Sequence, residues 1–401
     1  MLGGMRAVTW TQVAQYIVLI IAYLLPIFWI SNKMGAGFFP HFMLADEVAR
    51  IGELEQQFGF VKNSAADLAT VPKGLAGITK AHSAVNATPW AFISLALAMM
   101  MGTASLPHVM MRYFTTPSVK AARKSVGWSL FFIFLLYSSA PMLATLSKLS
   151  LIDPTLSTGI IGKSFAEVQS IDWFQNWNQA NLMFISDFNG NGTLELNEFF
   201  MGGKAVVLAT PEIAGLPYVI SGLVAAGGMA AAMSTADGLI LAIANAISHD
   251  VYYKMIDPKA ETAKRLLVAR VLLVIIGFAG ATIAAMEIQG ILGSVIWAFD
   301  FAMSGLFFPL VLGVWWKRAN RQGAIAGMAL GLGSAIWYLV WVRTGGSGFL
   351  GLTQLTFGIF GAGVSFVAMV VVSLMTQEPD KATQKMVDEV RIPSGRTVTG
   401  K

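Results

Sequence analysis

The sequence predicts an all-α integral membrane protein with eight transmembrane helices. Of its 401 residues, 55% are hydrophobic and only 12% are charged, which is about half of the charged share of a soluble domain. A soluble fold of this composition would expose large apolar patches, whereas a protein surrounded by lipid can do so without aggregating. The 11 Trp and 26 Phe residues also suit helices anchored at membrane interfaces.

Eight long apolar segments support this fold class. A helix needs about 20 mostly apolar residues to cross the hydrocarbon core, and it satisfies its own backbone hydrogen bonds there. A membrane β-barrel would instead show short segments of alternating hydrophobicity. The eight segments run approximately from Val8 to Ser31, Trp90 to Tyr113, Ser125 to Ser147, Leu216 to Ser248, Leu266 to Met286, Ile291 to Trp316, Gly323 to Val342, and Thr356 to Met375.

The basic residues predict the orientation of these helices. If the N-terminus faces the cytoplasm, the inner segments hold 17 Lys and Arg residues and the outer segments hold nine, while Arg270 lies within a span. Cytoplasmic loops of membrane proteins carry such an excess. We therefore expect a multi-pass protein of the plasma (inner) membrane with both termini cytoplasmic. The net charge of +5 is explained in this way and not by a nucleic-acid partner.

The segments divide the chain into four parts. Residues 1–147 carry the first three helices and an outer loop at about 32–89, and residues 148–215 form an extracytoplasmic insert. Residues 216–376 carry the last five helices, and residues 377–401 form a polar cytoplasmic tail, which we expect to be disordered from Arg391. The chain has no Cys, so no disulfide can stabilise the outer loops.

The insert contains a twelve-residue calcium-loop motif. Residues 187–198, DFNGNGTLELNE, fit the EF-hand pattern D-x-[DN]-x-[DN]-G-x5-E. In such a loop, oxygens at positions 1, 3, 5, 7, 9 and 12 hold the ion, and a glycine at position 6 makes the turn. The predicted ligands are Asp187, Asn189, Asn191, Thr193 (by its backbone carbonyl), Glu195 and Glu198.

The alternative is an acidic surface loop with Asn-Gly turns. The sequence offers no second loop to pair with this one, and only three of the ligands are charged. Extracellular calcium modules work at roughly 0.1 to 1 mM. We therefore expect a weak structural clip and not a cytosolic sensor.

The fourth apolar segment carries polar residues deep within it. Ala231, Ser234 and Thr235 stand at i, i+3 and i+4 and share one helix face. Two hydroxyls and a carbonyl are hard oxygen ligands, which suit Na⁺. The alternative is that both hydroxyls bond back to the preceding turn and tighten helix packing.

Two further segments suggest a substrate site. In the second, Gly102, Thr103, Ala104 and Ser105 precede a proline, and broken helices at mid-membrane expose backbone groups that bind substrates and ions. The alternative is an ordinary proline kink. In the sixth, Trp297 and Asp300 are candidates to line a substrate cavity, although Asp300 could instead pair with another helix.

These motifs together resemble the sodium:solute symporter family. The resemblance rests on GGMRAVTWTQ from Gly3, GTASLPHVMMRYFTTPSVKAARKSV from Gly102, AAAMSTADG with NAISHDVYYK in the fourth segment, and WAFDFAMSGLFFPLVLGVWWKRAN from Trp297. It is closest to the bacterial branch that includes acetate and other monocarboxylate permeases. It implies an inverted-repeat fold of five plus five helices, of which core helices five to twelve are present here. It also implies that Ala231, Ser234 and Thr235 form the sodium site of core helix eight.

The resemblance implies sodium-coupled symport of a small organic solute, a monocarboxylate such as acetate, by alternating access. Two departures matter. The chain begins within a family signature, so we expect an N-terminally truncated member, and Gln12 stands where many relatives carry the Asp of a further sodium site. The alternative is a non-transporting membrane remnant or module with a structural calcium loop. No catalytic constellation is visible, so we do not expect an enzyme.

Overall fold

The computed structural model describes residues 4–35, 37, 40–59, 63–78, 89–286 and 288–390. Within these residues seven helices are long and apolar enough to cross a membrane, and a bent pair of shorter helices provides an eighth. The prediction of a helical membrane protein is thereby confirmed. The chain forms two compact units: a first unit of residues 1–81 and 125–237, and a second unit of residues 82–124 and 238–401.

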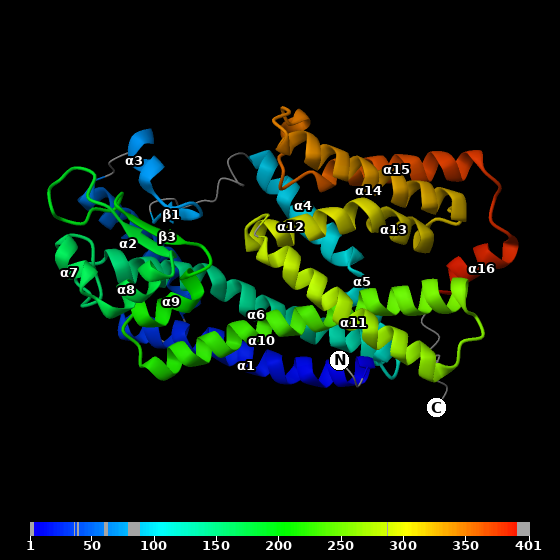
Figure 1. Cartoon of the computed structure of the whole chain (residues 1–401), viewed down its shortest axis with the longest axis horizontal. Coiled ribbons are helices and arrows are strands. Elements are labelled where there is room, and N and C mark those ends of the chain that lie inside the picture. Colours follow the sequence, from blue (N-terminus) through cyan, green and yellow to red (C-terminus); the bar gives the residue numbers. More distant parts are fainter. Residues whose placement is uncertain are drawn as a thin grey trace. The chain divides into compact units, whose positions relative to one another are not determined.

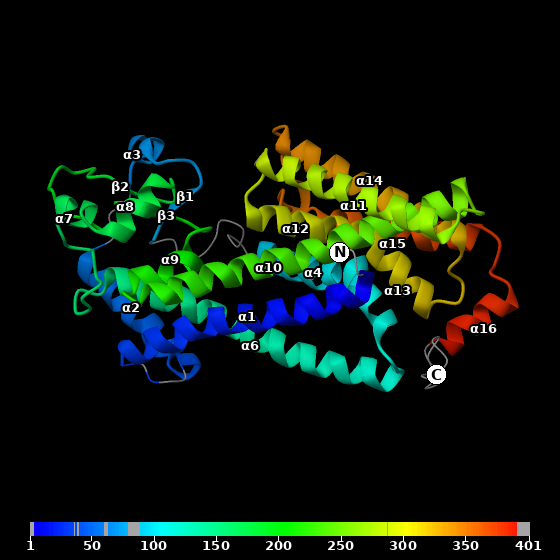
Figure 2. The ribbon, with the colours of Figure 1, turned by 60° about the horizontal axis from the view of Figure 1, so that its bottom comes forward.

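Three long helices form the membrane part of the first unit. They are α1 (Gly4–Lys33), α6 (Val119–Ile152) and α10 (Tyr218–Asn245), and α1 runs beside α10 in Figure 2. Ile27 of α1, Met142 of α6 and Val224 of α10 belong to one buried apolar cluster. A Cβ atom on Gly227 would lie 2.4 Å from the Cβ of Ala22. Glycine at this position therefore allows the backbones of α1 and α10 to approach closely.

Within the first unit, the predicted outer loop and the predicted insert form a small α+β cap that the sequence analysis did not predict. Its three-stranded sheet has the order β1-β3-β2, and both pairs are antiparallel. Strand β1 comes from the first outer loop and pairs with β3 of the insert. The strands are β1 (Leu75–Gly77), β2 (Met183–Ile185) and β3 (Phe199–Gly202), and the helices are α2 (Leu44–Phe58), α3 (Ala65–Thr70), α7 (Phe165–Gln169), α8 (Asp172–Gln179) and α9 (Val206–Ile213), with η1 (Pro40–Phe42).

Two ion pairs attach the predicted first outer loop to the C-terminal end of α6. Arg50 of α2 pairs with Asp153, which is fully buried, and Glu55 of α2 pairs with Lys148. Beneath them, Leu149 and Ile152 share a buried apolar cluster with residues of the insert. The cap is therefore built on one continuous core and not on flexible linkers.

The second unit contains the remaining membrane helices. Figure 1 shows α14 and α15 side by side, and this is the most extensive helix pair of the structure. The elements are α4 (Pro89–Ser105), α5 (Pro107–Met110), η3 (Met111–Thr115), the π-helical η4 (Ala246–Ile256), α11 (Thr262–Ala285), α12 (Ile291–Ala302), the π-helical η5 (Met303–Phe307), α13 (Phe308–Trp315), α14 (Arg321–Arg343), η6 (Phe349–Gly351), α15 (Gly358–Met375) and α16 (Lys381–Glu389). The tail predicted to be disordered from Arg391 lies outside the described residues.

Small residues on α14 allow it to pack tightly on its neighbours. A Cβ atom on Gly331 would lie 2.1 Å from the carbonyl oxygen of Ser304 and 2.6 Å from the Cβ of Ser365. Lipid gives helices no hydrophobic reason to associate, so close packing of this kind holds them together.

This packing predicts that alanine substitutions at two glycines of α14 have different effects on stability. Gly331→Ala should destabilise the second unit by about 1 to 3 kcal/mol, because the new methyl group overlaps backbone atoms. A Cβ atom on Gly333 would meet no described neighbour within 4 Å, so Gly333→Ala should be neutral or stabilise the helix by about 0.5 to 1 kcal/mol. Thermal unfolding of the two purified variants in detergent checks this. Equal melting temperatures would contradict the packing described.

Candidate functional site

The oxygens of the predicted sodium site converge on one face of α10. The carbonyl oxygen of Ala231 accepts hydrogen bonds from Ser234 Oγ at 2.9 Å and from Thr235 Oγ1 at 3.4 Å. Ser234 is half-buried and Thr235 is exposed. The two hydroxyls thus bond back to the preceding turn, as the packing alternative expects. They also bring three oxygens together at one point of the helix.

A side chain of α1 contacts this point. The Nε2 atom of Gln12 donates a hydrogen bond to the carbonyl oxygen of Ser234 at 2.6 Å, and Gln12 is 8% exposed. A carboxylate at this position would offer oxygens to a cation, whereas the amide presents a donor to the carbonyl. The sequence marked Gln12 only as a departure from a family pattern. Its partner is 222 residues away, so no local pattern could have indicated the contact.

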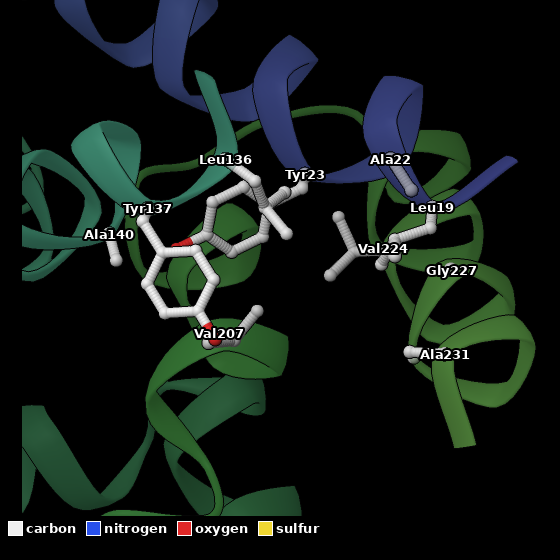
Figure 3. A pocket seen from close by; sticks show the side chains of 11 residues that line it. Leu19, Ala22, Tyr23, Leu136, Tyr137, Ala140, Val207, Val224, Gly227 and Ala231 are labelled. Atoms are coloured by element: carbon white, nitrogen blue, oxygen red, sulfur yellow. The ribbon is translucent and has the colours of Figure 1, made fainter. Parts of the chain in front are cut away.

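An apolar cavity lies next to Ala231 in the first unit. Its volume is about 330 Å³, which is at the lower end of the range for small-molecule sites. In Figure 3 the rings of Tyr23 and Tyr137 lie on one side, and Ala22, Val224 and Ala231 lie on the other. The lining residues are Leu19, Ala22, Tyr23, Leu136, Tyr137, Ala140, Val207, Val224, Gly227, Gly228 and Ala231. Sequence reasoning missed the two tyrosines, because each sits in an ordinary apolar helix.

The second predicted span is broken, as the sequence analysis expects. Helices α4 and α5 meet at an angle of 48°, where Leu106 has an extended backbone and Pro107 begins α5. The hydroxyls near the break bond back within α4, Thr103 Oγ1 to Met99 O at 2.6 Å and Ser105 Oγ to Met101 O at 2.5 Å.

The substrate-site candidates do not line one common surface in this conformation. Gly102 and Ser105 are buried, whereas Thr103 and Ala104 are exposed. Gly102 packs against α12, because a Cβ atom there would lie 2.6 Å from the carbonyl oxygen of Phe299. This contact places the end of α4 beside the residue that precedes Asp300.

The two candidates on α12 have different surroundings. Trp297 Nε1 donates a hydrogen bond to the carbonyl oxygen of Gln354 at 2.8 Å, and the guanidinium of Arg343 lies 5.1 Å from the centre of its ring. Asp300 is 0% exposed. Its carboxyl group is therefore closed off from solvent in this conformation and does not line an open cavity.

The calcium-loop residues adopt a compact turn structure. The two carboxylate oxygens of Asp187 accept the backbone N–H groups of Gly190 and Gly192 at 2.7 and 2.9 Å. The side-chain oxygens of Asn189 and Asn191 accept the N–H groups of the residues two positions later. Gly192 has a φ of 73°, a left-handed conformation that favours glycine.

The remaining predicted ligands are also placed around the loop. Glu198 is fully buried and accepts the N–H groups of Phe188 and Glu195 at 2.9 and 3.0 Å. Glu195 Oε1 accepts hydrogen bonds from the amide groups of Asn189 and Asn191 at 3.0 and 2.8 Å. Across the described ranges, no three acidic or histidine side chains gather closely enough to hold a metal ion by themselves.

A neighbouring segment supplies the backbone pairing that the sequence lacked. Leu194, at loop position 8, donates to the carbonyl oxygen of Lys163 at 2.8 Å and accepts from the N–H of Gly162 at 2.9 Å. Ser164 and Thr193 form an antiparallel bridge. The loop is thus held on one side by residues 162–164 and not by a second calcium loop.

The Gln12 contact can be tested by comparing the stability of two matched variants on α1. Gln12→Leu should destabilise the first unit by about 0.5 to 1.5 kcal/mol, because it removes a hydrogen bond between α1 and α10. Gln15 is equally buried at 8%, but its Oε1 has no hydrogen-bond partner in the described structure, so Gln15→Leu should cost less or stabilise the fold. Thermal unfolding of both variants tests this order, and a reversed order would contradict it.

Comparison with known proteins places these features in context. The chain is 34% identical over 478 aligned positions to an uncharacterized symporter of Cupriavidus necator, which covers 97% of this chain and 69% of that protein. It is 26% identical over 342 positions to a monocarboxylic acid transporter of Corynebacterium glutamicum, which covers 84% of this chain and 52% of that protein.

A solved structure has the same fold. A sodium-coupled sialic acid symporter, in a substrate-bound outward-open state, superimposes with a TM-score of 0.57 at 18% identity, over 94% of this chain and 64% of that chain. The chain therefore spans between about half and 69% of the lengths of the proteins it matches. These neighbours are transporters and not enzymes.

The family comparison covers most of the chain. The model of the sodium:solute symporter family matches residues 1–151 and 204–331. Residues 152–203, which contain the calcium-loop motif, lie between the two matched stretches. On this match, and on the 34% identity to the Cupriavidus symporter, the chain belongs to the sodium:solute symporter family.

Proposed function

We propose that this chain takes part in the sodium-coupled symport of a small organic solute by alternating access. The observation that carries the proposal is the convergence of three oxygens, from Ala231, Ser234 and Thr235, on one face of a membrane-spanning helix. We further propose that both termini face the cytoplasm of a plasma-membrane protein, as the distribution of basic residues favours.

The back-bonded hydroxyls are compatible with a bound cation. A hydroxyl that donates its hydrogen to Ala231 still has lone pairs for a cation, but the Ala231 carbonyl accepts both hydroxyls in addition to the helical N–H of Thr235. The Thr235 bond is the longer one at 3.4 Å, and bonds of this length are weak. Sodium binding would therefore release Thr235 from Ala231 and use all three oxygens as ligands.

We extend the proposal to a monocarboxylate as the solute. Similarity to the Corynebacterium monocarboxylic acid transporter supports this class. The cavity beside Ala231 supports a solute with an apolar part, because its walls are formed by aliphatic and small residues with two tyrosines. A solute held there would lie close to the proposed sodium ligands, where the cation could stabilise the carboxylate charge.

The sodium site predicts the behaviour of a double variant. Ser234→Ala combined with Thr235→Ala should abolish sodium-dependent uptake, because two of the three oxygen ligands are lost. Ser334→Ala is the matched control, since Ser334 Oγ makes the same kind of back-bond, to Gly331 O at 3.0 Å, on another membrane helix. Uptake of labelled acetate, propionate and pyruvate by cells expressing each variant, with and without Na⁺, provides the measurement.

The outcomes separate the two candidate functions. Unchanged sodium-dependent uptake by the double variant would defeat the site assignment. Sodium-independent uptake by the native chain would defeat sodium coupling. Absence of any uptake by the native chain would favour the alternative, a non-transporting membrane module.

We also propose that residues 187–198 bind Ca²⁺ as a structural clip. The motif places oxygens of Asp187, Asn189, Asn191, Thr193, Glu195 and Glu198 around one turn. The side chains of Asn189, Asn191 and Glu195 already converge on one another, and residues 162–164 hold the loop backbone. A cation would replace the amide donors that now form hydrogen bonds with Glu195.

This proposal predicts stabilisation by calcium. If the dissociation constant is about 0.1 mM, 10 mM Ca²⁺ should stabilise the fold by about 2.7 kcal/mol. Asp187→Ala or Glu198→Gln should remove the increase in melting temperature, whereas Asp172→Asn, an exposed acid on α8 of the same insert, should keep it. Thermal unfolding with Ca²⁺, with Mg²⁺ and with chelator measures the effect. An equal increase in all three variants would exclude the loop as the site.

A further inference from the structure

Asp300 is the most isolated ionisable side chain of the described structure. It is 0% exposed, and neither of its carboxyl oxygens has a hydrogen-bond partner in the described part of the chain. It lies near the end of α12, shortly before the π-helical segment η5 begins at Met303. Short π-helical segments within α-helices are frequent at functional sites.

The carboxyl group faces the start of α15. A Cβ atom on Gly358 would lie 2.4 Å from Asp300 Oδ1 and 2.7 Å from the terminal methyl of Met303. Ser304 Oγ bridges the two helices, donating to the carbonyl oxygens of Asp300 at 2.7 Å and of Gly358 at 3.2 Å. The carboxyl group is therefore enclosed by a helix contact made of small and apolar residues.

No charged group compensates the carboxylate within the described ranges. Helix α12 packs against α4, η5, α14 and α15, and α4, η5 and α15 carry no titratable residue. On α14, Tyr338 donates to the carbonyl oxygens of Phe349 and Leu352, Arg343 lies over Trp297, and Arg321 lies at the other end of the helix. None of the three forms a hydrogen bond or ion pair with Asp300 among the described residues.

An unpaired carboxylate in such surroundings is strongly disfavoured, so it must be neutralised by a ligand. Sodium is a poor candidate, because a hard cation needs several oxygen ligands. Here the nearby Ser304 hydroxyl is engaged with two carbonyl oxygens, and the backbone N–H of Gly358, which faces the carboxyl group, is a donor and cannot coordinate a cation. A proton needs no ligand shell, since it is held by the carboxyl group itself.

We propose that Asp300 is a proton-binding site, and that its proton holds α12 and η5 against the start of α15. Loss of the proton would leave an unpaired negative charge at this contact. The charge would favour separation of α12 and η5 from the start of α15. Asp300 belongs to the second unit, whereas Ser234 and Thr235 belong to the first.

Infrared spectroscopy of the purified full chain tests the proposal. A protonated carboxylic acid has a carbonyl stretching band that is separate from carboxylate bands and shifts in D₂O. The native chain should show this band near neutral pH, and Asp300→Asn should lose it. Asp250→Asn is the control, because Asp250 is exposed and interacts with His249 and Lys254, so this variant should keep the band. A native band that persists in Asp300→Asn would overturn the proposal.

Three further measurements test the proposal. The melting temperature of the native chain should fall as pH is raised and Asp300 loses its proton, whereas that of Asp300→Asn, which is neutral at every pH, should not follow this fall. If Asp300→Asn does not fold, Asp300→Glu should retain a band at a shifted frequency, and an unshifted band would refute the assignment. Loss of the native band on adding Na⁺ at constant pH would identify a cation site and overturn the proton site.

Discussion

A polar group inside the apolar membrane interior must find a partner, and this constraint organises the whole molecule. Polar side chains of the described structure meet this constraint in two ways, and some of them do not meet it. Ser234 and Thr235 bond to their own helix, and Gln12 bonds to a neighbouring helix. Asp300 does neither. The weak hydrogen bond of Thr235 and the missing partners of Asp300 leave oxygens available to a ligand at the proposed sodium and proton sites.

Close helix contacts make these arrangements possible. Gly227 allows α1 to approach α10, which lets Gln12 reach the carbonyl of Ser234. Gly358 leaves room for the carboxyl group of Asp300 between α12 and α15. In both units, small residues thus determine where backbones meet, and the polar residues beside them acquire their partners from that geometry.

The sequence predicted the membrane fold well because apolar length is a local signal. The break before Pro107 and the clustering of Ala231, Ser234 and Thr235 also followed from spacing along a single helix. The small sheet of the cap was missed, because its β1 and β3 strands are only three and four residues long and pair across distant segments. The partners of Gln12 and the isolation of Asp300 depend on tertiary packing, which no pattern within one segment reveals.

The insert differs from the membrane helices because most of it, residues 152–203, lies between the two stretches that the family model matches. Its residues Leu194 and Phe199 belong to an apolar core that it shares with Ile51 of α2 and Leu149 of α6. Leu194 contributes to that core and also pairs with residues 162–163. The loop at 187–198 is therefore built into the folded cap, where the proposed calcium ion would stabilise the fold.

The proposed transport function depends on a cation that binds the oxygens of α10. Equilibrium binding of radioactive Na⁺ to the purified chain, without any solute, tests it most directly. We expect a saturable component that unlabelled Na⁺ displaces and K⁺ does not. Binding that rises linearly with concentration, or that K⁺ displaces equally well, would contradict the account.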